Sequence, residues 1–284
     1  MSLLEALTLP FFQRAVIAGI LIAVMSGVLG VFVVQRRLAF LGDGLAHAAF
    51  GGMGIGAYVI VTSGLIGSSV ALLQHPLWIA LPFSLLAALV IAALRKRTRL
   101  SSDTAIGVSF AVSVALGVMF FSLIPPDVNL GVSVLDLLFG SILGVRRGDL
   151  LAISIVAALA VAALLAAWGR LSYATFDDEL ARSDGVRTGA LELALFLLAA
   201  VVIAVSASVV GIVLMAAYLV IPAAAARLLA PTLARMTLLS VALGVTSTVA
   251  GLALSFYLDV PSGATIVLTQ AALFVPAALF GHRR

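Results

Sequence analysis

The sequence predicts an all-α polytopic membrane protein, a bundle of about nine (eight to nine) transmembrane helices that forms one domain over residues 1–284. Hydrophobic residues make up 63% of the chain and charged residues 10%, whereas a soluble domain is typically about 25% charged. The mean hydropathy is +1.28. Apolar runs of roughly the 20 residues that a membrane-spanning helix needs recur from one end of the chain to the other.

The apolar runs define the expected elements in order. A run between residues 190 and 226 is long enough for two crossings, with Ser206-Ala207-Ser208 as the expected turn. Residues 131–145 are too short and, with Asp136, too polar to cross, so they are expected to form a short helix on the outer side. A bundle of eight follows if one span is only half inserted. The expected spans are residues 12–34, 39–61, 77–94, 104–123, 149–168, 189–206, 209–228, 236–256 and 263–281.

Basic residues predict the orientation, because cytoplasmic loops carry an excess of Lys and Arg. Placing the basic loops inside leaves only Arg14, Arg146 and Arg147 outside the cell. The amino terminus is then outside and the carboxyl terminus inside. No cleavable signal peptide is expected, because the first ten residues carry Glu5 instead of a basic segment and the first apolar run has full spanning length.

Several classes of protein are excluded by what the sequence lacks. The chain has no cysteine, so it has no disulfide and no thiolate metal site. Its single lysine, Lys96, is not part of a P-loop motif, and no H-E-x-x-H or G-x-S-x-G motif occurs. We therefore expect a protein that is not an enzyme, and any active transport must draw its energy from another polypeptide. The net charge of +4 comes from arginines that flank the membrane and indicates no nucleic-acid partner.

An acid and an imidazole four residues apart mark the second span. On a helix, Asp43 and His47 share one face, and both are ligand types suited to zinc or manganese. Ionisable groups at membrane depth indicate function. If the helix begins near Leu38, His47 lies about 13 Å along its axis, near the middle of the bilayer. The alternative is that Asp43 only pairs with Arg36 or Arg37 and that His47 is a packed imidazole.

One long soluble loop is expected, at residues 169–188. Thr175 can cap a short helix, the acidic run 177–179 would occupy the first turn, and Gly185 can end it. An amphipathic helix on the cytoplasmic side, with no partner in the chain, is expected to dock another protein. The alternative is a solvated connector.

Four sequence segments, in order across nearly the whole chain, resemble a known family. They are GVLGVFVVQRRLAFLGD (27–43) running on into AHA (46–48), LLFGSIL (137–143), FDDELARSDGV (176–186), and AYLVIPAAAAR (217–227) followed by YLDVPSGA (257–264). Together they resemble the membrane permease subunit of bacterial zinc/manganese ABC importers, which is related to the permeases of cobalamin importers. Those relatives have a short outer helix, in agreement with the one expected at 131–145.

The resemblance implies an importer of a divalent transition metal in the bacterial cytoplasmic (inner) membrane. The implied partners are a second copy of the chain in a homodimer, two cytoplasmic ABC ATPase subunits that bind the ATP, and an external metal-binding protein that delivers the ion. Asp43 and His47 are implied as metal ligands, with no permanently bound cofactor. Zinc is the first expectation for the cargo and manganese the second. A secondary transporter that uses Asp43 and His47 as an ion or proton relay is the alternative.

The resemblance also assigns the cytoplasmic loop. The segment at about 173–187 is implied to be the coupling helix, which would sit in a cleft of the ATPase. The residues expected to couple to the ATPase are Phe176, Asp177, Asp178, Glu179, Ala181, Arg182 and Gly185.

Overall fold

The computed structural model describes residues 8–64, 77–98, 100–125, 128, 140 and 142–281. This part of the chain is helical and contains no strand. The helices are α2 Pro10–Gln35, α3 Leu41–Thr62, α4 Leu77–Arg97, α5 Ser102–Ser122, the 3₁₀ turn η2 Ile142–Gly144, α7 Arg147–Ala166, α8 Trp168–Phe176, α9 Asp178–Ser183, α10 Thr188–Val210, α11 Ile212–Leu229, α12 Leu233–Leu258 and α13 Ser262–Phe280.

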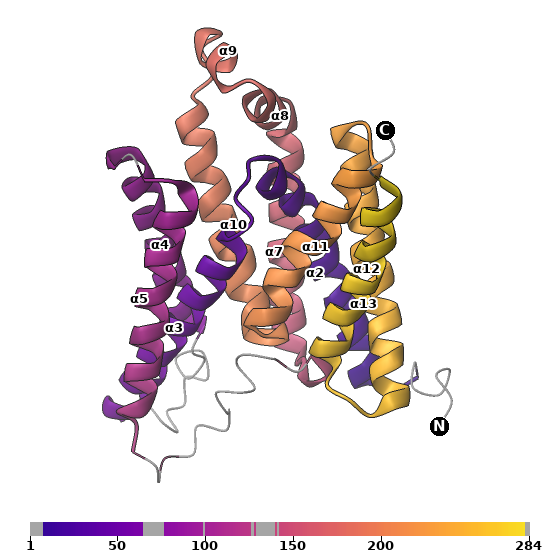
Figure 1. The fold of residues 1–284 in the computed structure, drawn as a ribbon. Helices are drawn as coiled ribbons and strands as arrows, with labels where there is room; N and C mark the ends of the chain where they lie inside the picture. Colours follow the sequence, from indigo (N-terminus) through magenta and orange to yellow (C-terminus); the bar gives the residue numbers. More distant parts are fainter. Residues whose placement is uncertain are drawn as a thin grey trace.

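Nine of the described helices are long and apolar enough to cross a membrane, which confirms the predicted fold class. Their ends lie within a few residues of the expected ones. The start of α2 and the end of α13 lie at opposite ends of the bundle, as an odd number of crossings requires (Figure 1). The helix expected at 131–145 falls for the most part outside the described residues, which in this stretch include only Gly140 and residues 142–145, with the 3₁₀ turn η2 among them.

The turn between α10 and α11 is displaced from its expected place. The prediction of a turn at 206–208 is wrong, because α10 continues through these residues to Val210. Ser208 stays compatible with the helix by donating its hydroxyl to the carbonyl of Val205 (2.9 Å). The chain turns instead at Gly211, whose φ of 85° favours a residue without a Cβ.

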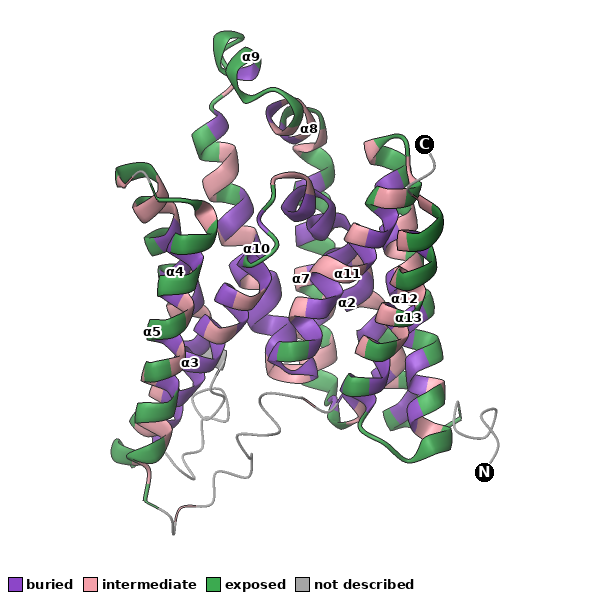
Figure 2. Cartoon of the chain, in the orientation of Figure 1, coloured by how far each residue is buried: buried purple, intermediate pink, exposed green. Residues whose placement is uncertain are grey.

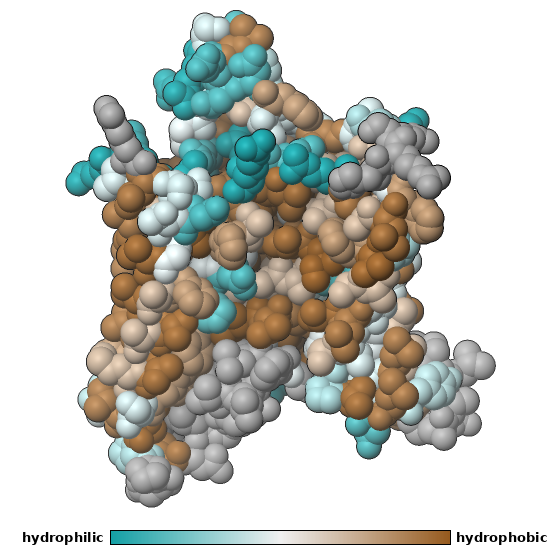
Figure 3. Space-filling model, viewed as in Figure 1, coloured by the Kyte–Doolittle hydropathy of each residue, from teal (hydrophilic) through white to brown (hydrophobic). Residues whose placement is uncertain are grey.

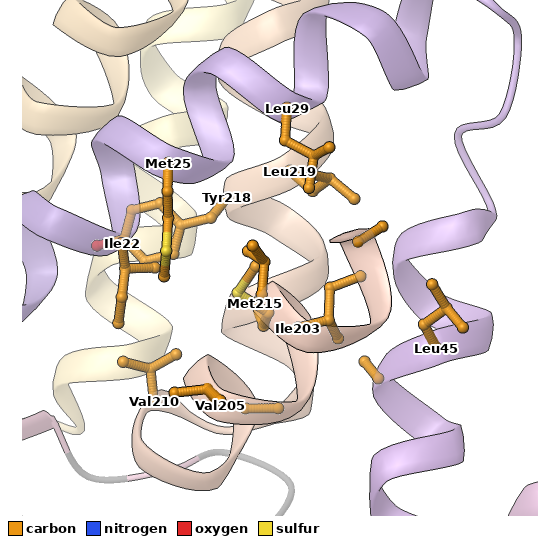
Figure 4. Close-up of a cluster of buried hydrophobic side chains, with 14 of the residues drawn as sticks. Ile22, Met25, Leu29, Leu45, Ile203, Val205, Val210, Met215, Tyr218 and Leu219 are labelled. Carbon is orange, nitrogen blue, oxygen red and sulfur yellow. The ribbon is translucent and has the colours of Figure 1, made fainter. Parts of the chain in front are cut away.

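Four helices form the inner part of the bundle. In α2, α3, α10 and α11, 61–72% of the most apolar stretch is buried, against 22–33% in the other five spans. Figure 2 shows the same contrast, with buried residues concentrated on these four helices. Their shared core contains Met25 of α2, Leu45 of α3, Ile203 of α10 and Met215 of α11 (Figure 4). The outer helices keep apolar faces for lipid or for another protein.

Hydrophilic side chains gather at one end of the molecule. Figure 3 shows them over the end that carries α8 and α9, above a broad hydrophobic belt. This end also carries the turn between α2 and α3 (Figure 1). The excess of basic residues in its loops predicts that this is the cytoplasmic end.

Candidate metal site and coupling segment

The turn between α2 and α3 positions the candidate metal site. The N–H of Leu38 donates to the carbonyl of Val33 (2.9 Å), and the N–H of Arg37 donates to that of Val34 (3.1 Å). These are the paired bonds of a Schellman motif. Arg37 has the left-handed conformation that the motif requires, with φ of 57°. The chain reverses here, and α3 begins at Leu41.

Asp43 and His47 lie one turn apart near the start of α3. Asp43 is in the first turn, where the positive end of the helix dipole stabilises a carboxylate. Nδ1 of His47 lies 3.0 Å from the backbone carbonyl of Asp43. Because a carbonyl only accepts, Nδ1 is the donor in this contact, and in the neutral imidazole Nε2 then carries the lone pair that can bind a metal. His47 is about 9 Å from the start of the helix, closer than expected, since α3 begins three residues later than Leu38.

The His47 face of α3 packs closely on α5. The imidazole makes a T-shaped contact with the ring of Phe110, with centroids 4.4 Å apart and an interplanar angle of 61°. Glycines on this face bring the backbones together, since a Cβ added at Gly51 would lie 2.6 Å from the carbonyl oxygen of Ser113. Paired positions advance together along the two helices, so α3 and α5 run parallel. The pairs are Gly44 with Ile106, His47 with Phe110, Gly51 with Ser113, and Gly54 with Gly117.

Asp43 is not held by either neighbouring arginine. Among the described residues, no ion pair joins it to Arg36 or Arg37. Arg36 donates from Nε to the hydroxyl of Thr175 (3.0 Å), and Arg37 is exposed. The Asp43 side chain itself is half-buried. The carboxylate therefore has no basic side-chain partner in this part of the chain.

One copy of the site supplies too few ligands for a metal ion. Zinc in proteins usually takes four ligands in a tetrahedral arrangement. Across the residues that the structure describes, no group of three or more His, Cys, Asp or Glu side chains could hold a metal. Asp43 and His47 thus offer one carboxylate and one imidazole. Further ligands would have to come from water, from a second copy or from outside the described ranges.

The segment expected to couple to an ATPase forms two short helices, α8 and α9. Asp177 lies between them and caps α9, because its carboxylate accepts from the N–H of Leu180 (2.9 Å). The prediction that Thr175 is this cap is wrong. Thr175 belongs to α8, where its hydroxyl donates to the carbonyl of Leu171 (2.6 Å).

The end of α9 at Gly185 agrees with expectation. The N–H of Val186 donates to the carbonyl of Ala181 (2.9 Å), and the N–H of Gly185, with φ of 82°, donates to that of Arg182 (3.0 Å). Ala181 is fully buried, so it anchors α9 and presents no side chain for docking. The other six residues assigned to coupling are exposed: Phe176, Asp177, Asp178, Glu179, Arg182 and Gly185.

Two features of this segment bear on its expected role as a docking element. Phe176 and Leu180 expose 68% and 51% of their surface at the cytoplasmic end, where an isolated segment gains nothing from exposed apolar groups. The hydroxyl of Tyr173 donates to Asp184 (2.5 Å), which ties α8 to the end of α9. This hydrogen bond is the main reason that the pKa of Tyr173 is raised to about 12.

Three contacts near the two candidate sites were not predicted from the sequence. They are the hydrogen bond from Arg36 to Thr175, the ion pair between Arg95 of α4 and Glu192 of α10, and the packing of Phe110 on His47. The first two join residues 139 and 97 positions apart. No helical periodicity connects residues so distant in the chain. Only Glu192, an acid in an apolar run, carried a local signal.

Comparison with known proteins identifies close similarity over nearly the whole chain. The model of the ABC 3 transport family matches residues 8–281. The manganese transport system membrane protein MntC of Listeria innocua is 31% identical over 274 residues, which cover 96% of this chain and 92% of that protein. The high-affinity zinc uptake system membrane protein ZnuB of Haemophilus influenzae is 31% identical over 270 residues, 95% of this chain and 97% of that protein.

A solved structure has the same architecture. It is that of PsaBC from Streptococcus pneumoniae in complex with Fab, with a TM-score of 0.79 and 30% sequence identity. The match covers 96% of this chain and 93% of that one.

Proposed function

The chain belongs to the ABC 3 transport family, and on that premise we propose that it is the permease subunit of an ATP-driven importer of a divalent transition metal. As a permease it is a multi-pass membrane protein and not itself an enzyme. The proposed partners are a second copy, two cytoplasmic ATPase subunits and an external metal-binding protein, in the cytoplasmic membrane of a bacterium.

One observation carries the proposed transport site. Asp43 has no arginine partner among the described residues, and it lies one turn from His47, whose Nδ1 contacts the Asp43 carbonyl and so leaves Nε2 as the nitrogen for a metal. A carboxylate without a partner inside a membrane protein is expensive unless a cation arrives. A divalent ion supplies that cation, and the carboxylate offsets its charge. Because the pair is only half of a tetrahedral site, we propose that the second copy contributes the same two residues.

The order of metal preference follows from the ligand types. Two oxygens and two nitrogens from paired subunits approach the tetrahedral set that zinc favours, so zinc is our first candidate. Manganese is the second, since it accepts oxygen and imidazole ligands as well. Relatives named for each metal match this chain at 31% identity.

In the proposed cycle, a loaded binding protein docks at the outer end and releases one ion to Asp43 and His47. ATP binding in the partner subunits closes their nucleotide sites and moves the segment formed by α8 and α9. That movement opens the inner side of the pathway. The site must bind weakly enough to release the ion inward, which a half-buried pair of ligands permits.

Uptake by the assembled complex tests the proposal. Asp43→Asn keeps the side-chain volume but removes the charge, and His47→Ala removes the nitrogen ligand. We expect either change to abolish uptake of labelled zinc and manganese, with the complex still present at its normal level. Asp103→Asn is a matched control, because Asp103 occupies the first turn of α5 as Asp43 does that of α3. It should transport like the wild type.

The two outcomes are distinct. If assembled Asp43→Asn and His47→Ala transport normally, the site assignment is wrong. If expression falls first, Asp43 and His47 serve folding and not transport. Copurification of a P-loop ATPase separates an ABC permease from an ion- or proton-coupled secondary transporter, which needs no such partner.

A further inference from the structure

The helix α8 lies against the cytoplasmic end of α2 through two side-chain contacts. Near its start, Trp168 packs edge-on against Phe32 of α2, with ring centroids 5.2 Å apart. Near its end, Thr175 accepts a hydrogen bond from Nε of Arg36, the residue that caps α2 (3.0 Å). The face of α8 between these points is buried at Leu171. The contacts therefore hold α8 along the last turn of α2.

The geometry of the Arg36 contact is specific. The Thr175 hydroxyl gives its proton to the carbonyl of Leu171 (2.6 Å), so its lone pairs are left for Arg36. Nη2 of Arg36 is buried without a hydrogen-bond partner among the described residues. Burial lowers the pKa of Arg36 below its ordinary value, and the charge of Asp178 on α9 partly offsets this effect. Arg36 thus has one donor engaged with α8, another donor unsatisfied, and an acid of α9 within electrostatic reach.

Arg36 is also directly connected to the metal site. It is followed by the left-handed Arg37, and α3 begins at Leu41, two residues before Asp43. The backbone bonds of the Schellman motif hold this turn in one conformation. A displacement of Arg36 therefore moves the start of α3, and the carboxylate with it, without passing through a flexible linker.

We propose that Arg36 and Thr175 are positioning residues that transmit movement of the α8–α9 segment to the start of α3, and so couple the ATPase to the metal site. This inference rests on the proposed function and assigns the connection inside the permease. It predicts that the hydrogen bond matters for the ratio of metal transported to ATP hydrolysed. A purely structural contact would change assembly and leave that ratio intact.

The test uses the complete transporter, with its ATPase and binding protein, in proteoliposomes. Thr175→Val removes the acceptor at nearly constant volume, while Thr175→Ser retains a hydroxyl. We expect Thr175→Val and Arg36→Gln each to lower the zinc or manganese transported per ATP about fivefold or more, the lower end of typical coupling between sites. Thr175→Ser should keep the wild-type ratio. Arg235→Gln, at an exposed arginine at the same end of the bundle, should also keep it.

The double variant decides whether the two residues act through one contact. If they do, Arg36→Gln with Thr175→Val lowers the ratio no further than either change alone. Wild-type ratios in both single variants, or losses that multiply in the double variant, would overturn the proposal. Should Arg36→Gln fail to assemble, the comparison of Thr175→Val with Thr175→Ser still decides the matter.

Failure of this inference is distinguishable from failure of the proposed function. If Asp43→Asn abolishes uptake while Thr175→Val keeps the wild-type ratio, the metal site stands and the Arg36 connection is wrong. If Asp43→Asn transports normally, the proposed site is wrong, whatever Thr175→Val does to the ratio.

Discussion

Replacing Gly51 by alanine tests the close approach of α3 and α5. The added Cβ would lie 2.6 Å from the carbonyl oxygen of Ser113 and 3.2 Å from Cε1 of Phe83. Ordinary contacts at such a position are 3.4–4 Å. The phenylalanine ring can move aside, but the backbone oxygen cannot. The two helices must therefore separate, and His47, one turn before Gly51, must shift against the ring on which it packs.

Gly107→Ala is the matched control for this change. Gly107 lies inside α5, and a Cβ there meets nothing within 4 Å. Both substitutions gain the helix propensity of alanine over glycine, about 1 kcal/mol, so the difference between them isolates the overpacking at Gly51. That term is typically about 1–3 kcal/mol. In a chain of this size, a loss of 1 kcal/mol in the free energy of unfolding lowers the unfolding temperature by about 2–4 °C. Gly51→Ala should therefore unfold roughly 2–12 °C below Gly107→Ala.

Thermal unfolding of the purified permease in detergent measures this difference, and metal uptake by the assembled complex measures its functional consequence. We expect Gly51→Ala to reduce uptake as well as stability, because the helix that moves carries Asp43 and His47. Equal unfolding temperatures for the two alanine variants would refute the reasoning, since they would mean that α3 and α5 leave room for a methyl group at Gly51.

Three further predictions concern other contacts. Glu179→Lys on exposed α9 should change the free energy of unfolding of the permease by no more than about 0.5 kcal/mol, but it should weaken copurification of the ATPase. Normal copurification would indicate that the α8–α9 segment is only a connector. Tyr218→Phe should lower the free energy of unfolding by about 1 kcal/mol, because Thr248 still donates to the carbonyl of Gly244 (2.7 Å). Thr248→Val should lower it more, by about 1–3 kcal/mol, because it leaves the buried tyrosine hydroxyl without its partner. Equal unfolding temperatures for the two variants would contradict this. Arg37→Gly should raise the free energy of unfolding by about 0.5–1 kcal/mol, because it removes a Cβ from a residue in the left-handed region. Denaturant unfolding that shows no increase in stability would contradict the left-handed conformation of this turn between α2 and α3.

The spans could be predicted from the sequence because their signal is local. A run of about 20 apolar residues satisfies its backbone hydrogen bonds within itself, whatever its neighbours are. The ends of the nine spans were therefore found within a few residues, even for α10 and α11, which are joined without a polar loop. The turn between those two was misplaced, because Ser and Ala fit a helix and only Gly211 favours a turn.

The details of the cytoplasmic segment show a different limit. Thr175 and Asp177 are both good helix caps by residue type, and the sequence offers no way to choose between them. The choice follows from tertiary structure, since Arg36 and the end of α2 hold Thr175 inside α8. Asp177 then becomes the first residue free to cap α9. A contact between residues 36 and 175 leaves no trace in periodicity, so a local pattern could not reveal it.

The candidate metal site combines both situations. The spacing of Asp43 and His47 predicted a shared helical face, and the structure places both near the start of α3. The same spacing could not decide whether the acid neutralises an arginine six or seven residues earlier. That question depends on where Arg36 goes, and its guanidinium turns toward α8 while Arg37 is exposed. With both basic neighbours directed elsewhere, no basic side chain of the described chain pairs with the Asp43 carboxylate, which lies at the positive end of the α3 dipole. Under the proposed function, the divalent ion is the cation that this carboxylate pairs with.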